Sequence, residues 1–273
     1  MLKISLFKNI DLKGLKILEN LILIIWLQYL IIDQYSNLYL LDSRLFYPRG
    51  IFRLVEILKI NFVPNQYLLL VILQICLILL VIYYMYKKRR STFLIFLLLI
   101  YIYELIKKGF GGHIDHRIIT LYLFTIIFYI SNNSNTVDNQ SKILPPYLFF
   151  ITQYFFIGFA RLINGFPTLF INNTMGDWLI QRSLRQNFYN LEIGLILSNT
   201  LHPIVLNFFL IITTIVEMSL VLTLFKSKKY TVIILLIMSF THLGIFLLMG
   251  INFIENVFLL ISFAYLTYKY EFK

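Results

Sequence analysis

The sequence predicts an all-α, polytopic membrane protein, and three observations lead to this fold class. Of the 273 residues, 59% are hydrophobic and 14% are charged, whereas soluble domains contain about 45–50% apolar and about 25% charged residues. The apolar residues form runs of about the 20 residues with which a helix crosses a bilayer. Basic residues flank these runs. We therefore expect one multi-pass helical bundle in the cell membrane, with residues 1–273 as a single domain.

Eight apolar runs are predicted to span the membrane. They comprise residues 17–35, 66–86, 92–106, 118–131, 147–164, 204–225, 230–250 and 251–268. No small-residue cleavage site follows the first run, so we expect it to be retained and not removed as a signal peptide. The third and fourth runs are short, which indicates tilted, re-entrant or partly buried segments.

The basic residues predict an orientation with both termini inside. In this arrangement 14 of the 24 Lys and Arg residues lie on inside segments and 10 on outside segments, as the cytoplasmic preference of basic residues requires. The turn Lys87-Lys88-Arg89-Arg90 supports this topology, although a lipid headgroup or acidic partner could also bind there. The longer connections, 36–65 and 165–203, then lie outside, and the polar segment 131–146 is expected to be a flexible inside link.

Two residues of opposite charge lie in predicted spans. Arg161 follows the apolar run 147–160, where a guanidinium costs free energy unless it snorkels or finds a partner. Glu217 lies in the middle of its span, where an unpaired ionised carboxylate is costly, so it is either paired or protonated. Arg161 is a candidate partner for Glu217. Such a pair would either join two helices or take part in catalysis.

The histidines leave several interpretations open. His242 lies near the middle of the seventh span, where a hydrogen-bonded core residue and a ligand-binding residue both fit. His113, Asp115 and His116 follow two glycines at the mouth of the fourth span. They could form a polar turn that caps a helix, a metal site or an acid–base pair. We favour the capping turn and predict no metal cofactor.

The remaining chemistry-bearing residues favour structural roles. Cys76 is the only cysteine and lies in an apolar run, which predicts a buried structural thiol. Glu104 and Glu255 fall in short or terminal spans, where contact with an interfacial base is expected. The sequence contains no phosphate-binding Gly-rich loop, no Gly-x-Ser-x-Gly elbow and no zinc-protease motif. Any reaction would therefore use the intramembrane acids, bases and aromatic residues, or a lipid-soluble cofactor.

Several segments together resemble a known membrane family. They are Tyr154-Phe155-Phe156-Ile157-Gly158-Phe159-Ala160-Arg161-Leu162, the downstream Asp177-Trp178, a later span with Phe240, His242, Gly250, Asn252 and Phe253, and Leu41-Asp42-Ser43-Arg44-Leu45-Phe46-Tyr47-Pro48-Arg49-Gly50 after the first span. In order and position they resemble the vitamin K-dependent γ-carboxylase-like membrane domain, called HTTM. His116, or in second place His113, resembles the family's His at the start of its fourth helix.

The resemblance implies a bound ligand more than it implies carboxylation. In that family the span corresponding to 154–162 carries a lysine that acts as base toward vitamin K hydroquinone, whose epoxidation drives deprotonation of a peptide glutamate. Here Ala160 and Arg161 take the place of the family's basic pair. Arginine, with a pKa above about 12, is a poor base. The resemblance thus implies a quinone, lipid or secreted peptide as ligand, without competent γ-carboxylation.

The membrane-only bacterial branch of the family gives a second implication. It resembles the sporulation-delaying protein B group, which is implicated in maturing secreted toxin peptides, and it lacks the large extracytoplasmic domain of the carboxylases. A role in peptide modification or maturation follows for this chain.

Two alternatives remain open at the level of sequence. In a transporter or channel, Glu217, Arg161 and His242 would line a path, although no internal repeat is evident. In a non-catalytic subunit of a membrane complex, the chain would present a secreted peptide to another enzyme. The expected partners are membrane lipids and a secreted peptide. The net charge of +11 does not indicate nucleic acid, because the basic residues flank apolar runs.

Overall fold

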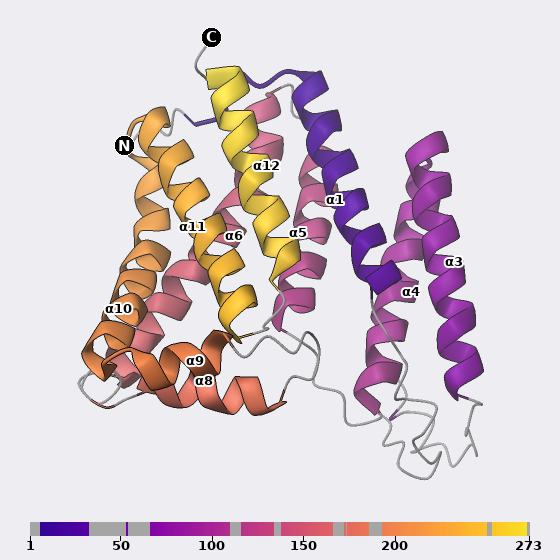
Figure 1. Ribbon diagram of the computed structural model, residues 1–273. Helices are drawn as coiled ribbons and strands as arrows, with labels where there is room; N and C mark the ends of the chain where they lie inside the picture. The colour runs from indigo at the N-terminus through magenta and orange to yellow at the C-terminus, as the bar shows by residue number, and fades with distance from the viewer. Residues whose placement is uncertain are drawn as a thin grey trace. The chain divides into compact units, whose positions relative to one another are not determined.

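The chain is helical wherever its computed structural model describes regular structure. The described residues are 6–32, 53, 66–109, 116–133, 138–165, 172, 174–185, 193–249 and 253–271. Within them lie α1 (Leu12–Ile32), α3 (Gln66–Lys87), α4 (Arg90–Gly109), α5 (His116–Asn132), α6 (Asn139–Gly165), α8 (Thr174–Arg185), α9 (Ile193–Thr200), α10 (Pro203–Ser219), the 3₁₀ helix η3 (Leu220–Leu224), α11 (Lys228–Met249) and α12 (Ile254–Glu271), as drawn in Figure 1. The all-α prediction is confirmed.

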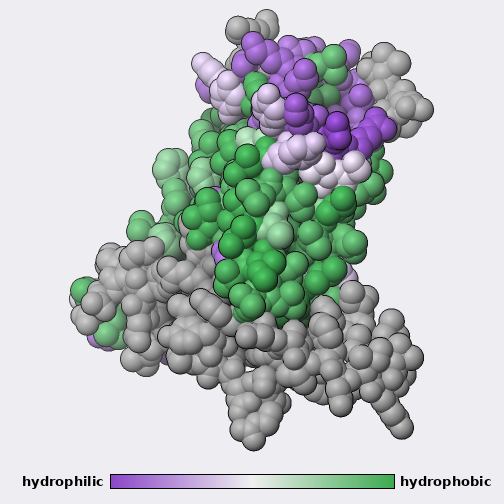
Figure 2. Space-filling view, turned by 90° about the vertical axis from the view of Figure 1, so that its right-hand side faces the viewer, coloured by the Kyte–Doolittle hydropathy of each residue, from purple (hydrophilic) through white to green (hydrophobic). Residues whose placement is uncertain are grey.

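Five of the described helices are long and apolar enough to cross a membrane. They cover Leu12–Ile31, Leu68–Lys87, Asn139–Gly165, Pro203–Leu224 and Lys228–Leu247. The other three predicted runs coincide with α4, α5 and α12, of which α5 has only 17 residues. Many large apolar side chains on these helices are exposed, and Figure 2 shows one face with a broad apolar field and hydrophilic residues gathered at one end. Such a surface suits a lipid environment.

Two expectations from the sequence are wrong. The segment 131–146 was expected to be a flexible link, but α6 begins at Asn139 and continues through Pro145 and Pro146. The Asp138 carboxylate accepts the backbone N–H of Gln140 at 3.0 Å and thereby caps the new helix. Cys76 was expected to be buried, but it is exposed, because an apolar position on a membrane helix can face lipid as well as protein.

The described contacts divide the chain into two compact units. Unit 1 comprises Met1–Leu18 and Ile127–Lys273, and unit 2 comprises Glu19–Ile126. Helices α1 and α5 each contribute residues to both units. The organisation of residues 1–273 as a single domain stays a prediction.

The core of unit 2 centres on Trp26, which is fully buried. Its indole N–H donates to the Thr125 hydroxyl at 3.0 Å, and its ring meets Phe96 edge to face at 5.5 Å between centroids. The buried Glu104 accepts a hydrogen bond from the Tyr29 hydroxyl and lies 3.5 Å from the Lys107 ammonium. The expected contact of Glu104 with a basic residue is therefore present, and it satisfies a carboxylate that would be costly if unpaired.

The turn between α3 and α4 in unit 2 carries the compact basic sequence. Lys88 has a φ of 51°, and its backbone N–H closes the end of α3 by donating to the Tyr84 carbonyl at 2.8 Å. The Lys88 ammonium lies 2.9 Å from the Glu19 carboxylate. Lys87 and Arg90 are exposed. This turn thus presents most of its positive charge outward.

An N-terminal segment is inserted into unit 1. Phe7 is fully buried, although its φ of 62° lies in the left-handed region that L-residues avoid. Its ring meets Tyr147 of α6 edge to face at 5.1 Å and lies 5.9 Å from Phe263 of α12. The side chain of Gln140 donates to the Leu6 carbonyl at 2.7 Å. The aromatic contacts thus hold the strained residue in place and join the chain's beginning to α6 and α12.

Helices α8 and α9 lie across the end of unit 1 where α10 begins (Figure 1). Pro203 occupies the first turn of α10, where its missing N–H costs no intrahelical bond. His202 caps this helix with its ring nitrogen Nδ1, which accepts the backbone N–H of Ile204 at 3.3 Å. The chain thereby changes direction sharply before it returns through the bundle.

Two substitutions at Phe7 separate the cost of its strained backbone from the stabilisation by its packed ring. Phe7→Ala should destabilise the protein by about 3–5 kcal/mol, because it removes the buried ring and keeps the strained backbone. Phe7→Gly should destabilise the protein by about 1 kcal/mol less than Phe7→Ala, because glycine adopts the left-handed conformation without cost. Chemical unfolding in mixed micelles compares the two variants. A glycine variant clearly less stable than the alanine variant would contradict the role assigned to the strained backbone.

Candidate functional site

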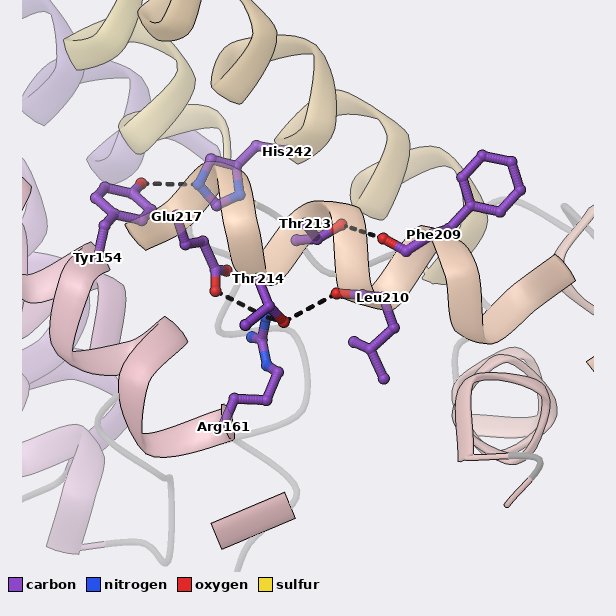
Figure 3. A network of polar contacts seen from close by, with 8 residues as sticks. All are labelled: Tyr154, Arg161, Phe209, Leu210, Thr213, Thr214, Glu217 and His242. Atoms are coloured by element: carbon purple, nitrogen blue, oxygen red, sulfur yellow. Dashed lines mark hydrogen bonds and ion pairs between the residues drawn. The ribbon is translucent and has the colours of Figure 1, made fainter. Parts of the chain in front are cut away.

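Three helices of unit 1 bring polar side chains together inside the bundle. Tyr154 and Arg161 lie on α6 at positions i and i+7, one face of a helix. Thr214 and Glu217 lie on α10 at positions i and i+3, and His242 comes from α11. Figure 3 shows these five residues pointing toward one another. We call them the Arg161 cluster.

The centre of the Arg161 cluster is an ion pair between α6 and α10. The Nη1 atom of Arg161 lies 2.7 Å from Oε2 of Glu217 and donates more weakly to the Thr214 hydroxyl at 3.4 Å. Glu217 is only 4% exposed, so without this partner its charge would be strongly unfavourable. The Arg161 side chain keeps 20% of its surface exposed. The pairing expected from the sequence is therefore present, and the Arg161 side chain is not fully enclosed.

Gly158 permits this close approach of α6 and α10. A Cβ atom built at Gly158 would lie 2.9 Å from Cγ of Met218, 3.1 Å from the Thr214 carbonyl oxygen and 3.2 Å from Cβ of Glu217. The obstructing carbonyl belongs to the α10 backbone and cannot rotate away. A larger residue here would separate the helices at the level of the ion pair.

A second polar contact joins α6 to α11. His242 Nε2 and the Tyr154 hydroxyl are 2.8 Å apart, and both side chains are buried. Asn256 at the start of α12 lies near the Tyr154 hydroxyl. His242 Nδ1 is buried and has no hydrogen-bond partner among the described residues. The Nδ1 atom of His242 can therefore form a hydrogen bond with a further polar group.

The two contacts form one electrostatic unit. Tyr154 lies within the field of the Glu217 carboxylate, and His242 lies within the field of the Arg161 guanidinium. The Arg161–Glu217 pair is neutral overall, whereas His242 and Tyr154 can each donate or accept a hydrogen bond. The arrangement can therefore hold a ligand's oxygen atoms between a cationic fork and a neutral donor, but it offers no lysine base.

The other residues singled out from the sequence lie elsewhere or outside the described part. Asp177 lies in the first turn of α8 and is exposed. Trp178 packs against the buried Leu179 and Leu206. In the described ranges no hydrogen bond or ion pair joins Asp177 to the Arg161 cluster. The structure thus gives Trp178 a packing role between α8 and α10.

The side chains of the candidate residues at the mouth of the fourth span lie outside the described part of the structure. His116 begins α5 in unit 2, but its side chain is not described, and His113 and Asp115 fall outside the described residues. Among the residues whose placement is described, no group of three His, Cys, Asp or Glu side chains could hold a metal ion. The choice between a capping turn and an acid–base pair at this position stays a prediction.

Sequence reasoning did not select Gly158, Thr214 or Asn256 as site residues. The helical spacing of Tyr154, Gly158 and Arg161 could have placed the glycine on the functional face, because positions i, i+4 and i+7 share one side of a helix. Nothing in the sequence alone pairs Asn256 with α6, since this contact depends on how α12 packs.

Comparisons of the chain with protein-family models, with curated proteins and with solved structures find no match. The family resemblance of the sequence motifs therefore remains an expectation, and the site is interpreted from its own geometry.

Gly158→Ala should destabilise the protein by about 1–3 kcal/mol, because the added methyl group meets the α10 backbone. Gly244→Ala on α11 is the matched control, since a Cβ there has no neighbour within 4 Å. Alanine at that position should be neutral or slightly stabilising. Equal midpoints for the two variants in chemical unfolding would contradict the close packing of α6 against α10.

The ion pair can be tested by a double-mutant cycle with Arg161→Met and Glu217→Met. The free energy of unfolding should fall by about 3–5 kcal/mol in each single variant, because each leaves a buried charge unpaired. In the double variant it should fall by much less than the sum of the two. Lys88→Met and Glu19→Met provide a control pair whose ammonium is more exposed, and its coupling should be small. Additive losses at Arg161 and Glu217 would show that the two charges do not interact.

Proposed function

We propose that this chain is a membrane protein that binds an oxygen-bearing apolar ligand, a quinone or lipid, at the Arg161 cluster. The observation that carries the proposal is the convergence of Arg161, Glu217, Tyr154 and His242 from three apolar helices. Ionisable side chains are expensive within a bilayer, and where they persist they usually mark a ligand, substrate or ion site. The resemblance to the HTTM family supports a quinone as the ligand.

The exposed part of Arg161 supports recognition of an oxyanion or carbonyl oxygen. A guanidinium has five N–H donors in a planar fork, and the described contacts of Arg161 involve only Nη1. The unpartnered Nδ1 of His242 offers a second polar contact to the same ligand. A quinone or quinol has two oxygens on an apolar ring, which matches one cationic and one neutral partner.

The cluster supports binding better than γ-carboxylation. A carboxylase of the resembled family needs a lysine base, and Arg161 cannot release a proton at physiological pH. Its retained charge instead stabilises a negatively charged oxygen in a low-dielectric site. A bound secreted peptide would use the same fork for a carboxylate, so a role in peptide maturation rests on this binding function.

The proposed topology has eight spans with both termini inside. It adds α4, α5 and α12 to the five helices that meet the criteria of length and apolarity. The exposed basic residues of the α3–α4 turn then lie on the inner side, together with Lys226 before α11 and Lys229 in its first turn. This distribution follows the preference of Lys and Arg for the cytoplasm.

Ligand retention tests the binding function. Protein purified in mild detergent should carry a quinone or lipid that is detected by mass spectrometry after solvent extraction. Arg161→Lys should retain the ion pair and the fold but lose the planar fork, so ligand occupancy should fall about tenfold. Arg90→Lys, at an exposed position on α4, is the matched control and should retain full occupancy. Equal occupancy in the two variants, or a wild-type protein that is empty after gentle purification, would argue against the proposal.

Cysteine accessibility tests the topology. In a Cys76→Ser background, Asn172→Cys should react with a membrane-impermeant maleimide in intact cells, whereas Lys229→Cys should react only after permeabilisation. Both native residues are exposed, so the reagent can reach either position once it is on the correct side. The reverse labelling pattern would reject the inside placement of the termini.

A further inference from the structure

A polar cavity opens in unit 1 between the start of α1 and the end of α12. It has a volume of about 520 Å³ and is lined by Asn9, Asp11, Lys13, Lys269 and Tyr270. The first three residues precede or begin α1, and the last two lie at the end of α12. We call it the terminal cavity. None of its lining residues belongs to the Arg161 cluster.

The wall formed by Asp11 and Tyr270 is fixed by local contacts. Asp11 Oδ1 accepts the backbone N–H of Gly14 at 2.7 Å and so caps α1. This bond lowers the pKa of Asp11. A Cβ atom at Gly14 would lie 3.0 and 3.1 Å from the Tyr270 ring, so the glycine allows Tyr270 to pack closely against the start of α1. The terminal cavity is therefore built by both helices and is not a gap between mobile side chains.

Lys269 also lines the terminal cavity and is held in place by neighbouring tyrosines. Its ammonium donates to the Tyr265 hydroxyl at 3.1 Å and lies 5.4 Å from the ring centroids of Tyr265 and Tyr270. The hydrogen bond from Lys269 to Tyr265 raises the pKa of Lys269, so the group stays charged at neutral pH. Lys13 adds a second, exposed ammonium. The two ammonium groups outnumber the Asp11 carboxylate in the lining, so the cavity has a net positive charge.

The depth of the terminal cavity fits the headgroup region of a bilayer. The apolar span of α1 starts at Leu12, directly beside the cavity. Tyr265 and Tyr268 on the last turns of α12 are exposed, as aromatic residues at a membrane–water interface commonly are. In the proposed topology this end of the helices is cytoplasmic, and basic pockets between transmembrane helices on that side bind anionic lipid headgroups. The phosphate of such a lipid would lie at the same level as Lys13 and Lys269.

We propose that the terminal cavity binds the phosphate of a membrane phospholipid, with Lys13 and Lys269 as its charged ligands. Asn9 adds an exposed polar side chain to the same lining for the remaining headgroup oxygens. The acyl chains would lie along the apolar surface that begins at Leu12. The bound lipid would then tie the beginning of α1 to the end of α12.

Lipid titration tests the proposal. Delipidated protein in a non-ionic detergent is titrated with phosphatidylglycerol, with phosphatidylcholine of the same chains or with inorganic phosphate, and bound lipid is counted by native mass spectrometry. Phosphatidylglycerol should bind with 1:1 stoichiometry at low concentration. The variant Lys13→Gln with Lys269→Gln should weaken this binding about tenfold or more. Lys226→Gln with Lys229→Gln removes the same charge from the residues just before and at the start of α11 and is the control.

Each outcome decides the question. Equal weakening in the two double variants would show that lipid responds only to total surface charge, which would overturn the proposal. Displacement of the lipid by millimolar inorganic phosphate, with phosphate alone saturating the site, would assign the site to soluble phosphate and overturn the lipid assignment. If Lys269→Gln impairs folding, Lys13→Gln alone should still weaken binding, because Lys13 is exposed and its loss leaves the fold intact. Unchanged binding in that folded variant would reject the site.

Discussion

The ion pair between Arg161 and Glu217 is the constraint on which the proposed site depends. In an apolar bundle a carboxylate that is 4% exposed keeps its charge only beside a fixed cation, and a 2.7 Å contact requires α6 and α10 to lie close together. Gly158 supplies the necessary space on α6. The same approach positions Tyr154, one turn before Gly158, to meet His242 on α11. One electrostatic requirement therefore fixes the spacing of two helices and the alignment of a third.

The sequence predicts elements whose cause is local or energetic, and fails where the cause is tertiary. Each predicted apolar run coincides with a helix, because the length and hydropathy of a run suffice to predict a helix there. The Arg161–Glu217 pair could be predicted because two isolated charges in spans have few ways to be satisfied. The contact between Tyr154 and His242 joins residues 88 positions apart, and no periodicity encodes it. The start of α6 was missed because the capping role of Asp138 was not visible in a polar, Asn-rich segment.

Unit 1 contains both ends of the chain, and different forces hold them. On the apolar side, Phe7 inserts between Tyr147 and Phe263 despite its left-handed backbone. On the polar side, Asp11 caps α1 while Tyr270 packs against Gly14. The two sets of contacts lie within a few residues of each other in the sequence. They explain why the segment before α1 has a defined position, and they leave a polar cavity between the helix ends where a headgroup can bind.

The choice of arginine at position 161 determines what kind of site this cluster can be. A lysine at that position could pair with Glu217 and, once its pKa were lowered by burial, could also accept a proton. Arginine keeps its charge under all physiological conditions. It therefore gives up proton transfer and gains a permanent cation with several donors. Proton exchange within the cluster would have to involve His242, Tyr154 or Glu217, of which His242 alone has a buried ring nitrogen without a described partner. A ligand that binds both Arg161 and His242 would use the permanent charge of the arginine and the unpartnered Nδ1 of the histidine.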